Sequence, residues 1–372
     1  MNILFILENY YPHLGGVEVL FRNLCEGLAD LGHNISIVTH RIKGTKEFEI
    51  INKVNVYRVN CMHSRYFFTF LAIPKVFKLA KECDMIHTTT FNGAFPAWFV
   101  SKLLRKKCII NINEVWVGRW TKITEMNWLN AKIHEILEKM IYLLNFDRYV
   151  AISKATQKQL LDIGVDKNKI DVIYCGVDYK HWNPKLYKNI KKKLGLEDNF
   201  VYLFSGRPGV SKGLEYLIKA VPLISSKIPN SKLLAIVSKD KAYKKRLDHI
   251  LRLIKQLKIE DKVIIHDPVQ YKELPNYIKS ADCVVVPSLA EGFGFAAAEA
   301  CAMNIPVVAS DTTSLPEVVS GKYVLVKPKD EKSIAEGVID IFNGKYNKTK
   351  LRLFKKEDFI KKHLDLYKNM LR

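Results

Sequence analysis

Residues 283–299 read CVVVPSLAEGFGFAAAE, and this stretch decides the fold. Its first part, Cys283–Ser288, is a short β-branched run typical of a buried strand, and alanines typical of a helix follow Phe295. Gly292 and Gly294 lie between them, where the backbone has to turn tightly. The stretch predicts a strand, a turn and a helix whose free N–H groups face a ligand.

Two carboxylates belong to the same stretch. We expect Glu291 in the turn and Glu299 about one turn into the helix. Carboxylate oxygens accept several hydrogen bonds, so each group can hold a vicinal diol, one on a ribose and the other on a sugar. The alternative is that Glu291 is solvated and that Glu299 lies on an exposed helix face.

The alternation of short apolar runs and helical segments extends over the whole chain. The predicted strands are Asn2–Leu7, Ile35–Thr39, Val54–Asn60, Met85–Thr88, Cys108–Asn113, Arg148–Ser153, Ile170–Cys175, Phe200–Gly206, Lys232–Ser238, Val263–Asp267, Cys283–Ser288, Pro306–Ser310 and Tyr323–Val326. A stripe of Val17, Leu20, Leu24, Leu28 and Leu31 predicts the first helix. Nearly continuous apolar strands are covered on both faces, which predicts two doubly wound α/β domains.

The domain seam is expected where HWNP and a lysine run interrupt the pattern, within residues 178–193. We therefore assign residues 1–182 to an N-terminal domain, 183–350 to a C-terminal domain and 351–372 to a last segment. A helix over about Lys356–Leu371 follows the final strand. Ligands of open α/β sheets bind beyond the carboxyl ends of the strands, so the loops there are the candidate sites.

Composition narrows the class of protein. With 372 residues, 48% hydrophobic and 26% charged, the chain is neither disordered nor collagen-like. Its formal charge of +21 favours anionic partners. The start, MNILFILENYYP, has no basic segment and only a short apolar run, so we expect a cytoplasmic protein without a signal peptide. Seven scattered cysteines predict reduced thiols rather than disulfides or a zinc site.

Two further glycine-containing loops follow predicted strands. In SGRPGVSKG, residues 205–213, Arg207 and Lys212 can straddle a diphosphate, and the alternative is two solvated cations. In YYPHLGGVE, residues 10–18, Gly15 and Gly16 precede the first helix. Neither loop is a Walker motif or a G-x-G-x-x-G dinucleotide fingerprint.

Together these motifs resemble the retaining glycosyltransferases of family 4, with the GT-B fold. The resemblance runs from YYPHLGGVE through VAISKATQKQL and VIYCGVD to GRPGVSKG, EGFGFAAAEA and PVVASDTTSLPEVV. It implies two Rossmann-like domains that face each other across a cleft. The N-terminal domain lies on the acceptor side, the C-terminal domain on the nucleotide-sugar donor side, and the last helix returns to the N-terminal domain.

The resemblance also implies roles for individual residues. Glu299 would hold the nucleotide ribose, and Glu291 would stand near the transferred sugar. The backbone N–H groups of Gly292, Phe293, Gly294 and Phe295 would face that sugar. Arg207 and Lys212 would hold the donor diphosphate as catalytic cations, with Glu291 as a third catalytic residue, and Gly15 and Gly16 would approach the donor from the other domain.

Three positions depart from the family pattern. The family commonly has a histidine where this chain has Asn113, followed by Glu114, and asparagine does not titrate. The glycine pair before Leu-Pro-Glu is replaced by Thr313 and Ser314. The glycine-rich turn after the Lys232–Ser238 strand reads Ser-Lys-Asp at residues 238–240.

The expected reaction is sugar transfer from a nucleotide diphosphate sugar, a UDP-sugar first, to an acceptor hydroxyl, without a cofactor. No D-x-D motif or His/Cys ligand spacing occurs, so no metal is expected. A UDP-sugar 2-epimerase of the same fold and a non-catalytic nucleotide-sugar sensor remain alternatives, whereas a phosphorylase would need a pyridoxal-binding lysine context that the sequence does not show. A basic nucleic-acid-binding protein lacks a supporting motif, and we expect no nucleic-acid partner.

The acceptor side is predicted from aromatic residues. Asn113, Glu114 and Trp116 are its candidate residues, and four tryptophans fall between positions 98 and 128. The segment RYFFTFLAIPK, residues 65–75, is aromatic with basic ends. Aromatic side chains beside cations suit an anionic membrane surface or a lipid-linked acceptor. The alternative is an ordinary helix core.

Overall fold

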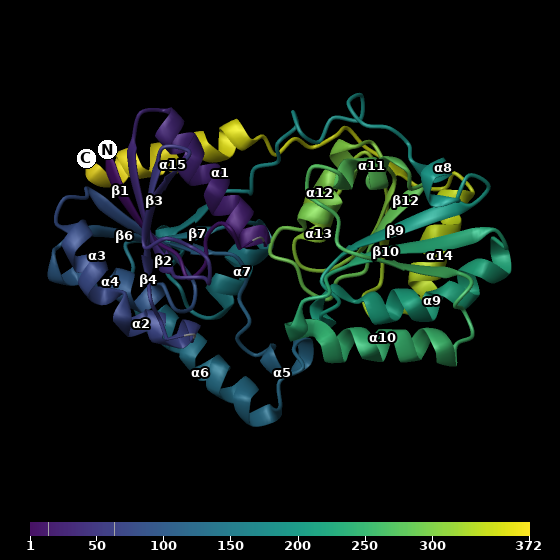
Figure 1. Cartoon of the computed structure of the whole chain (residues 1–372), viewed down its shortest axis with the longest axis horizontal. Coiled ribbons are helices and arrows are strands. Elements are labelled where there is room, and N and C mark those ends of the chain that lie inside the picture. The colour runs from purple at the N-terminus through teal and green to yellow at the C-terminus, as the bar shows by residue number, and fades with distance from the viewer. Residues whose placement is uncertain (14, 63) are drawn as a thin grey trace. The chain divides into compact units, whose positions relative to one another are not determined.

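The computed structural model describes residues 1–13, 15–62 and 64–372 (Figure 1). The chain forms two compact units. The first contains Met1–Thr121, Met126–Gly176 and Phe354–Arg372, and the second contains Lys122–Glu125 and Val177–Leu353. The chain thus passes into the second unit at 176/177 and returns at 353/354, next to the 182/183 and 350/351 divisions expected from the sequence.

The first unit is built on an eight-stranded sheet in the order β3-β4-β2-β1-β5-β6-β7-β8. Neighbouring strands are parallel except for the antiparallel pair β3 and β4. The strands are β1 (Asn2–Ile6), β2 (Asn34–His40), β3 (Phe48–Ile51), β4 (Val54–Val59), β5 (Met85–Thr89), β6 (Lys107–Ile112), β7 (Arg148–Ala151) and β8 (Ile170–Val172).

Helices cover both faces of this sheet. They are α1 (Gly16–Asp30), α2 (Phe68–Leu71), α3 (Ile73–Ala80), α4 (Ala94–Leu103), α6 (Trp128–Leu143), α7 (Lys154–Asp162) and α15 (Lys356–Leu371). Helix α5 (Trp120–Ile123) begins in the first unit and ends in the second. On one face, α1 packs against α15, and Phe21 of α1 and Tyr367 of α15 both contact the His87 ring on β5. On the other face, side chains of α3, α4 and α6 form a core with β5 and β6.

The second unit is built on a seven-stranded sheet in the order β11-β10-β9-β12-β13-β14-β15. Its strands are β9 (Phe200–Gly206), β10 (Ser231–Val237), β11 (Val263–His266), β12 (Cys283–Val286), β13 (Val307–Ser310), β14 (Lys322–Val326) and β15 (Asn347–Lys348), of which only β15 is antiparallel to its neighbour. The helices are α8 (Lys191–Leu194), α9 (Leu214–Lys227), α10 (Lys244–Gln256), α11 (Leu274–Lys279), α12 (Phe295–Ala302), α13 (Leu315–Val318) and α14 (Glu331–Phe342). Apolar residues of β9, β10, β12, α9 and α14 form its core.

Every strand predicted from the sequence is present, and the predicted fold class of two parallel α/β domains is confirmed. The last helix begins and ends at the predicted residues and belongs to the first unit. All seven cysteines are free and buried, as expected for core thiols. Within the described residues, no helix is both long enough and apolar enough to cross a bilayer.

Candidate active site

The loop after β12 turns as its glycines predict. Gly294 caps α12 in the left-handed region, at φ +93°. This conformation favours glycine, and a β-carbon there would also lie 2.7 Å from Leu315 Cδ2 and displace that side chain. The helix begins at Phe295, and its first N–H groups therefore face the region beyond the carboxyl end of β12.

Glu291 is held at both its side chain and its backbone. Its Oε1 atom accepts hydrogen bonds from Lys212 Nζ at 2.6 Å and from Ser288 Oγ at 2.8 Å. Its N–H donates to Thr313 Oγ1 at 3.0 Å, and its carbonyl accepts from Ser314 Oγ at 3.0 Å. The Glu291 side chain is only 12% exposed, so the alternative of a freely solvated carboxylate is wrong.

The departure at Thr313 and Ser314 has a structural explanation. Thr313 has φ +48°, a left-handed conformation that glycine adopts readily and a β-branched residue adopts rarely. Its hydroxyl accepts the N–H of Glu291, and the neighbouring Ser314 hydroxyl binds the carbonyl of the same residue. Two hydroxyls that glycine would not supply therefore fix the backbone of Glu291.

The β9 and β12 loops touch, because their strands are neighbours in the sheet. Leu289 N–H donates to Ser211 O at 2.7 Å across the two loops. Gly213 has φ +68°, and a β-carbon there would lie 1.9 Å from Pro287 O. Lys212 comes directly before this close approach, which places its ammonium group against Glu291. The two loops thus meet at the sheet edge.

Arg207 does not share this contact. It is exposed, and its Nη1 donates to Tyr243 OH at 3.2 Å, with the guanidinium carbon 5.9 Å from the centre of the Tyr243 ring. Lys212 pairs with Glu291 instead. The expected pair of cations is therefore divided between two different neighbours.

Glu299 is buried on α12, with 9% of its surface exposed, so the alternative of an exposed helix face is wrong. Burial raises the pKa of its carboxyl to about 8. Within the described residues, no hydrogen bond or cation offsets this effect of burial on the pKa. Burial, and after it the charge of Glu299, raises the pKa of nearby Tyr271, whose OH accepts a hydrogen bond from Trp182 Nε1 at 3.0 Å. The ionised form of such a carboxylate is favoured only where hydrogen bonds or a cation offset the cost of burial.

In the first unit, the glycine loop leads into α1 as predicted. Gly15 caps the helix in an extended conformation, and Gly16 is its first residue. A β-carbon on Gly15 would lie 2.4 Å from Glu18 Oε2, and Glu18 Oε1 lies 3.1 Å from His13 Nδ1. Leu14, in the middle of the YYPHLGGVE motif, lies outside the described residues.

Asn113, where the family commonly has histidine, is fixed by neighbouring polar groups. Its Nδ2 donates to Thr89 Oγ1 at 2.8 Å, and its Oδ1 accepts from Asn111 Nδ2 at 3.0 Å. The Thr89 hydroxyl donates in turn to Asn111 O at 3.1 Å. The amide is therefore anchored at the carboxyl ends of β5 and β6, which fits a positional contact rather than proton transfer.

The neighbouring segment, from the half-buried Glu114 to Trp120, is anchored by a residue that the sequence analysis missed. Glu138 on α6 is fully buried and accepts from Trp116 N at 2.8 Å, Trp120 Nε1 at 2.7 Å and Tyr142 OH at 3.1 Å. Burial raises its pKa, although these hydrogen bonds oppose the shift. In the sequence, Glu138 is a single glutamate among apolar residues. That pattern by itself indicates a solvated side chain.

A second missed carboxylate, Glu8, follows β1 at the same edge of the first sheet. It accepts from Asn92 Nδ2 at 2.8 Å and from Arg65 Nη1 at 3.2 Å. Burial raises its pKa, and the charge of Arg65 opposes this shift.

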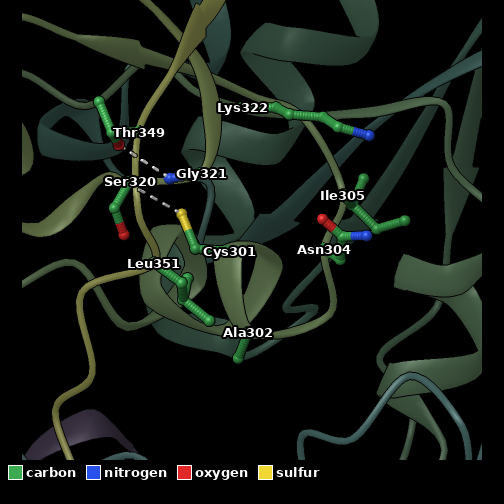
Figure 2. Close-up of a pocket in the computed structure, with 9 residues that line it drawn as sticks. All are labelled: Cys301, Ala302, Asn304, Ile305, Ser320, Gly321, Lys322, Thr349 and Leu351. Atoms are coloured by element: carbon green, nitrogen blue, oxygen red, sulfur yellow. Dashed lines mark hydrogen bonds between the residues drawn. The ribbon is translucent and has the colours of Figure 1, made fainter.

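A cavity of about 290 Å³ in the second unit does not belong to the candidate site (Figure 2). It lies where α12 ends and β14 begins, at the opposite edge of the sheet. Its wall includes two contacts drawn in Figure 2, Ser320 N–H to Cys301 Sγ at 3.5 Å and Gly321 N–H to Thr349 Oγ1 at 3.1 Å. Across the part of the chain that the structure describes, no three His, Cys, Asp or Glu side chains gather as a metal site.

Comparison with known proteins matches both halves of the chain. The family "Glycosyltransferase Family 4" matches residues 14–181, and "Glycosyl transferases group 1" matches residues 187–357. An uncharacterized glycosyltransferase of Methanocaldococcus jannaschii is 30% identical over 91% of this chain and 88% of its own length. A D-inositol 3-phosphate glycosyltransferase of Paenarthrobacter aurescens is 33% identical over 82% of this chain and 78% of its own length.

Solved structures of similar fold cover the full chain. A sucrose-phosphate synthase from Thermosynechococcus elongatus aligns with a TM-score of 0.81 and 21% identity over 100% of this chain and 99% of its own. HepE from Anabaena, solved in complex with UDP-glucose, aligns with a TM-score of 0.77 and 18% identity over 99% of this chain and 100% of its own. At these identities the likeness concerns the fold.

Proposed function

We propose, since the chain belongs to the family 4 glycosyltransferases and has their GT-B fold, that it transfers a sugar from a UDP-sugar to an acceptor hydroxyl with retention of configuration and without a metal. One observation carries the proposal. The Lys212–Glu291 pair, at 2.6 Å, joins the two loops at the sheet edge, and the next helix carries Glu299, a buried carboxylate to which no described residue donates a hydrogen bond.

Glu299 is the proposed ribose ligand. Burial favours its protonated form, because a charge away from water and without a partner is costly. Two ribose hydroxyls would donate hydrogen bonds to the ionised form and lower the pKa of the group. The donor would thereby supply the hydrogen bonds that the described residues leave unmade.

Lys212 and Arg207 are the proposed ligands of the donor diphosphate. The Lys212 ammonium has three N–H donors and Glu291 accepts one, so two remain for phosphate oxygens. Arg207 is exposed on the same loop, and release from Tyr243 would cost little because the contact is open to solvent. Charge that grows on the leaving diphosphate is then stabilised by fixed cations, which supports turnover without a metal.

The sugar is expected beside Glu291. The backbone of this residue is clamped by Thr313 and Ser314, so its carboxylate and the N–H groups that follow it have a fixed position. Phe293 has its side chain buried, so it contributes to this surface through its backbone alone. We name no protein nucleophile. Attack on the same face as the leaving phosphate, which accepts the acceptor's proton, accounts for retention.

The uracil base is proposed from the likeness to proteins solved with it. HepE from Anabaena has been solved with UDP, and a trehalose-phosphate synthase of the same fold is described as UDP-forming. The acceptor is proposed to be lipid-linked or to lie at a membrane surface, which is supported by exposed aromatic side chains at Tyr66, Phe67 and Phe70.

The deciding experiment combines binding and product analysis. The full chain is heated with UDP-glucose, UDP-N-acetylglucosamine, GDP-mannose or ADP-glucose, and a donor at 100 times its Kd should stabilise the fold by about 2.7 kcal/mol. A UDP-sugar should raise the Tm most. The product formed with an anionic lipid extract as acceptor is then analysed by NMR, which should show the anomeric configuration of the donor. Stabilisation by none of the four donors, or an inverted product, would overturn the proposal.

A further inference from the structure

Helix α6 exposes its apolar side chains and buries its acidic ones. Its exposed apolar residues are Leu129 (61% exposed), Ile133 (45%), Ile136 (59%), Leu137 (49%), Met140 (55%) and Leu143 (82%). Their spacing of three, four and seven places them along one stripe of the helix, called here the apolar face of α6. The opposite side buries Glu135 and Glu138 beside Ala131 and Ile141. A solvent-facing helix normally has the reverse arrangement.

The inward glutamates are satisfied, so the orientation of α6 is well determined. Glu138 accepts three hydrogen bonds from the Trp116, Trp120 and Tyr142 groups described above. Glu135 pairs with Lys132 at 3.4 Å and with Lys139 at 3.3 Å. A rotation that hid the apolar face would break these contacts. The apolar face is therefore the outer surface of the folded helix.

Aromatic side chains from α2 and the turn before it extend this surface. Tyr66 (49% exposed), Phe67 (48%) and Phe70 (63%) form what we call the aromatic patch. Tyr66 OH lies 3.3 Å from His134 Nε2 on α6, which joins the patch to the helix. Figure 1 shows α2 and α6 on the same side of the first unit. Phe68 is fully buried, so it is not part of this surface.

The charge around this surface is positive. Helices α2, α3 and α4 contain no acidic residue, whereas Lys75, Lys78 and Lys102 lie on them. Both glutamates of α6 are turned inward. Within the described residues, helices α2, α3, α4 and α6 thus carry exposed apolar groups and lysines but no exposed carboxylate of their own, although Lys75 pairs at 3.7 Å with the exposed Glu47 that precedes β3. Single exposed apolar residues are ordinary, but a contiguous group of this size marks an interaction surface.

We propose that the apolar face of α6 and the aromatic patch bind the interface of an anionic lipid bilayer. Apolar side chains would enter the headgroup region, and the lysines would meet lipid phosphates. Trp128, 68% exposed at the start of α6, is a side-chain type suited to that depth. A second copy of the chain is the less suitable occupant, because two chains of +21 repel each other.

This inference deepens the lipid-acceptor part of the proposed function, but its test measures binding and not transfer. The full chain is sedimented with vesicles of phosphatidylcholine alone or of phosphatidylcholine mixed with phosphatidylglycerol, whose negative surface attracts lysines. The test variant is Leu129→Gln/Ile136→Gln/Leu143→Gln. Glutamine keeps the helix propensity and removes apolar surface. The matched control is Leu186→Gln/Leu251→Gln/Leu353→Gln, three exposed leucines of the second unit.

The wild type and the control should sediment with the anionic vesicles, and high salt should weaken this binding without abolishing it. The test variant should bind at least about tenfold less well, a change of about 1.4 kcal/mol, with unchanged helix content and unchanged stabilisation by UDP-glucose. Equal binding of the test variant would overturn the proposal, as would a wild type that stays in the supernatant. A wild-type dimer that the test variant converts to a monomer would assign the face to a second copy and also overturn it. Failure of UDP-glucose binding in every variant would instead count against the proposed function.

Discussion

At the scale of single residues, Glu299 offers the sharpest test of the donor site. Its pKa is raised to about 8 by burial, and donor hydroxyls would favour its charged form. Donor binding below pH 8 should therefore release a proton, and donor affinity should rise as the pH increases from 6 to about 8. Calorimetry in two buffers of different ionisation enthalpy measures this release directly.

The variant Glu299→Gln should lose this pH dependence and bind the donor more weakly, by about 1.5 to 3 kcal/mol for a hydrogen bond to a charged group. Its stability should also change with pH in a definite direction. The pKa of Glu299 is about 8 in the folded protein, above its ordinary value of 4.5. The stability of the wild type should therefore fall as the pH rises from about 4.5 to 8 and then level off. The variant, which has no carboxyl group at this position, should not show this fall. Equal proton release by both proteins would contradict the assigned role.

Lys212 carries the second residue-scale prediction. Lys212→Ala should lower kcat at saturating donor by roughly 10² to 10³, as removal of one oxyanion donor does, because the charge it meets grows in the transition state. Arg207→Ala should act in the same direction. The control is Lys219→Ala, whose ammonium group also pairs with a glutamate at 2.6 Å but lies on α9. A normal kcat for both loop variants would make these cations binding contacts only.

Most of the site residues that sequence alone identified lie in loops that follow predicted strands, and Glu299 lies in the helix after such a loop. Glu291, Lys212 and Gly294 could be found because glycine spacing and strand ends place them at one sheet edge. Glu138 and Glu8 could not be found in this way. Their roles depend on burial and on donors from distant segments, such as Trp116 N and Asn92 Nδ2, which no local pattern encodes.

At the scale of elements, α6 has two functional sides, a buried face with Glu138 and the exposed apolar face of α6. Its buried face holds the Trp116–Trp120 segment through Glu138. Glu138→Gln keeps the shape of the side chain but places an amide N–H₂ against one of the donors. We expect altered tryptophan fluorescence and a higher KM for the acceptor, with donor affinity unchanged, because the segment lies on the proposed acceptor side.

The control for this prediction is Glu135→Gln, on the same helix. In the described part of the chain, Glu135 pairs with Lys132 and Lys139 and forms no hydrogen bond with a tryptophan, so its replacement should leave the fluorescence unchanged. If both variants shift the fluorescence equally, the effect belongs to α6 as a whole and Glu138 has no special positioning role.

Elements were predictable where burial produced a pattern. The two strands that the sequence analysis missed are both at sheet edges: β3 (Phe48–Ile51) is half-exposed, and β15 (Asn347–Lys348) is two exposed polar residues. Neither carries the apolar run that marks a strand covered on both faces. The outward direction of the α6 stripe was equally hidden, since an apolar stripe predicts a helix but does not tell which side the protein covers.

At the scale of the whole molecule, the fold followed from the repeated strand and helix pattern, and the return of α15 to the first unit followed from the family resemblance. What the sequence could not supply is the partner of each charged group. The formal charge of +21 indicated anionic partners in general. The structure adds that both glutamates of α6 are buried, so the exposed side of this helix has no acidic residue.

The last prediction concerns turnover by the complete enzyme in the presence of a chelator. If Lys212, Arg207 and the α12 amides stabilise the leaving diphosphate, EDTA should leave kcat and the donor KM largely unchanged. The initial rate of UDP release from UDP-glucose is measured after dialysis against EDTA, and again after addition of magnesium or manganese. The Lys212→Ala variant provides the internal comparison, because a cation added in excess could replace a missing ammonium group there and restore part of its rate. Loss of wild-type activity on chelation, with recovery on addition of metal, would show that the diphosphate charge is neutralised by a bound cation rather than by the side chains of the β9 loop.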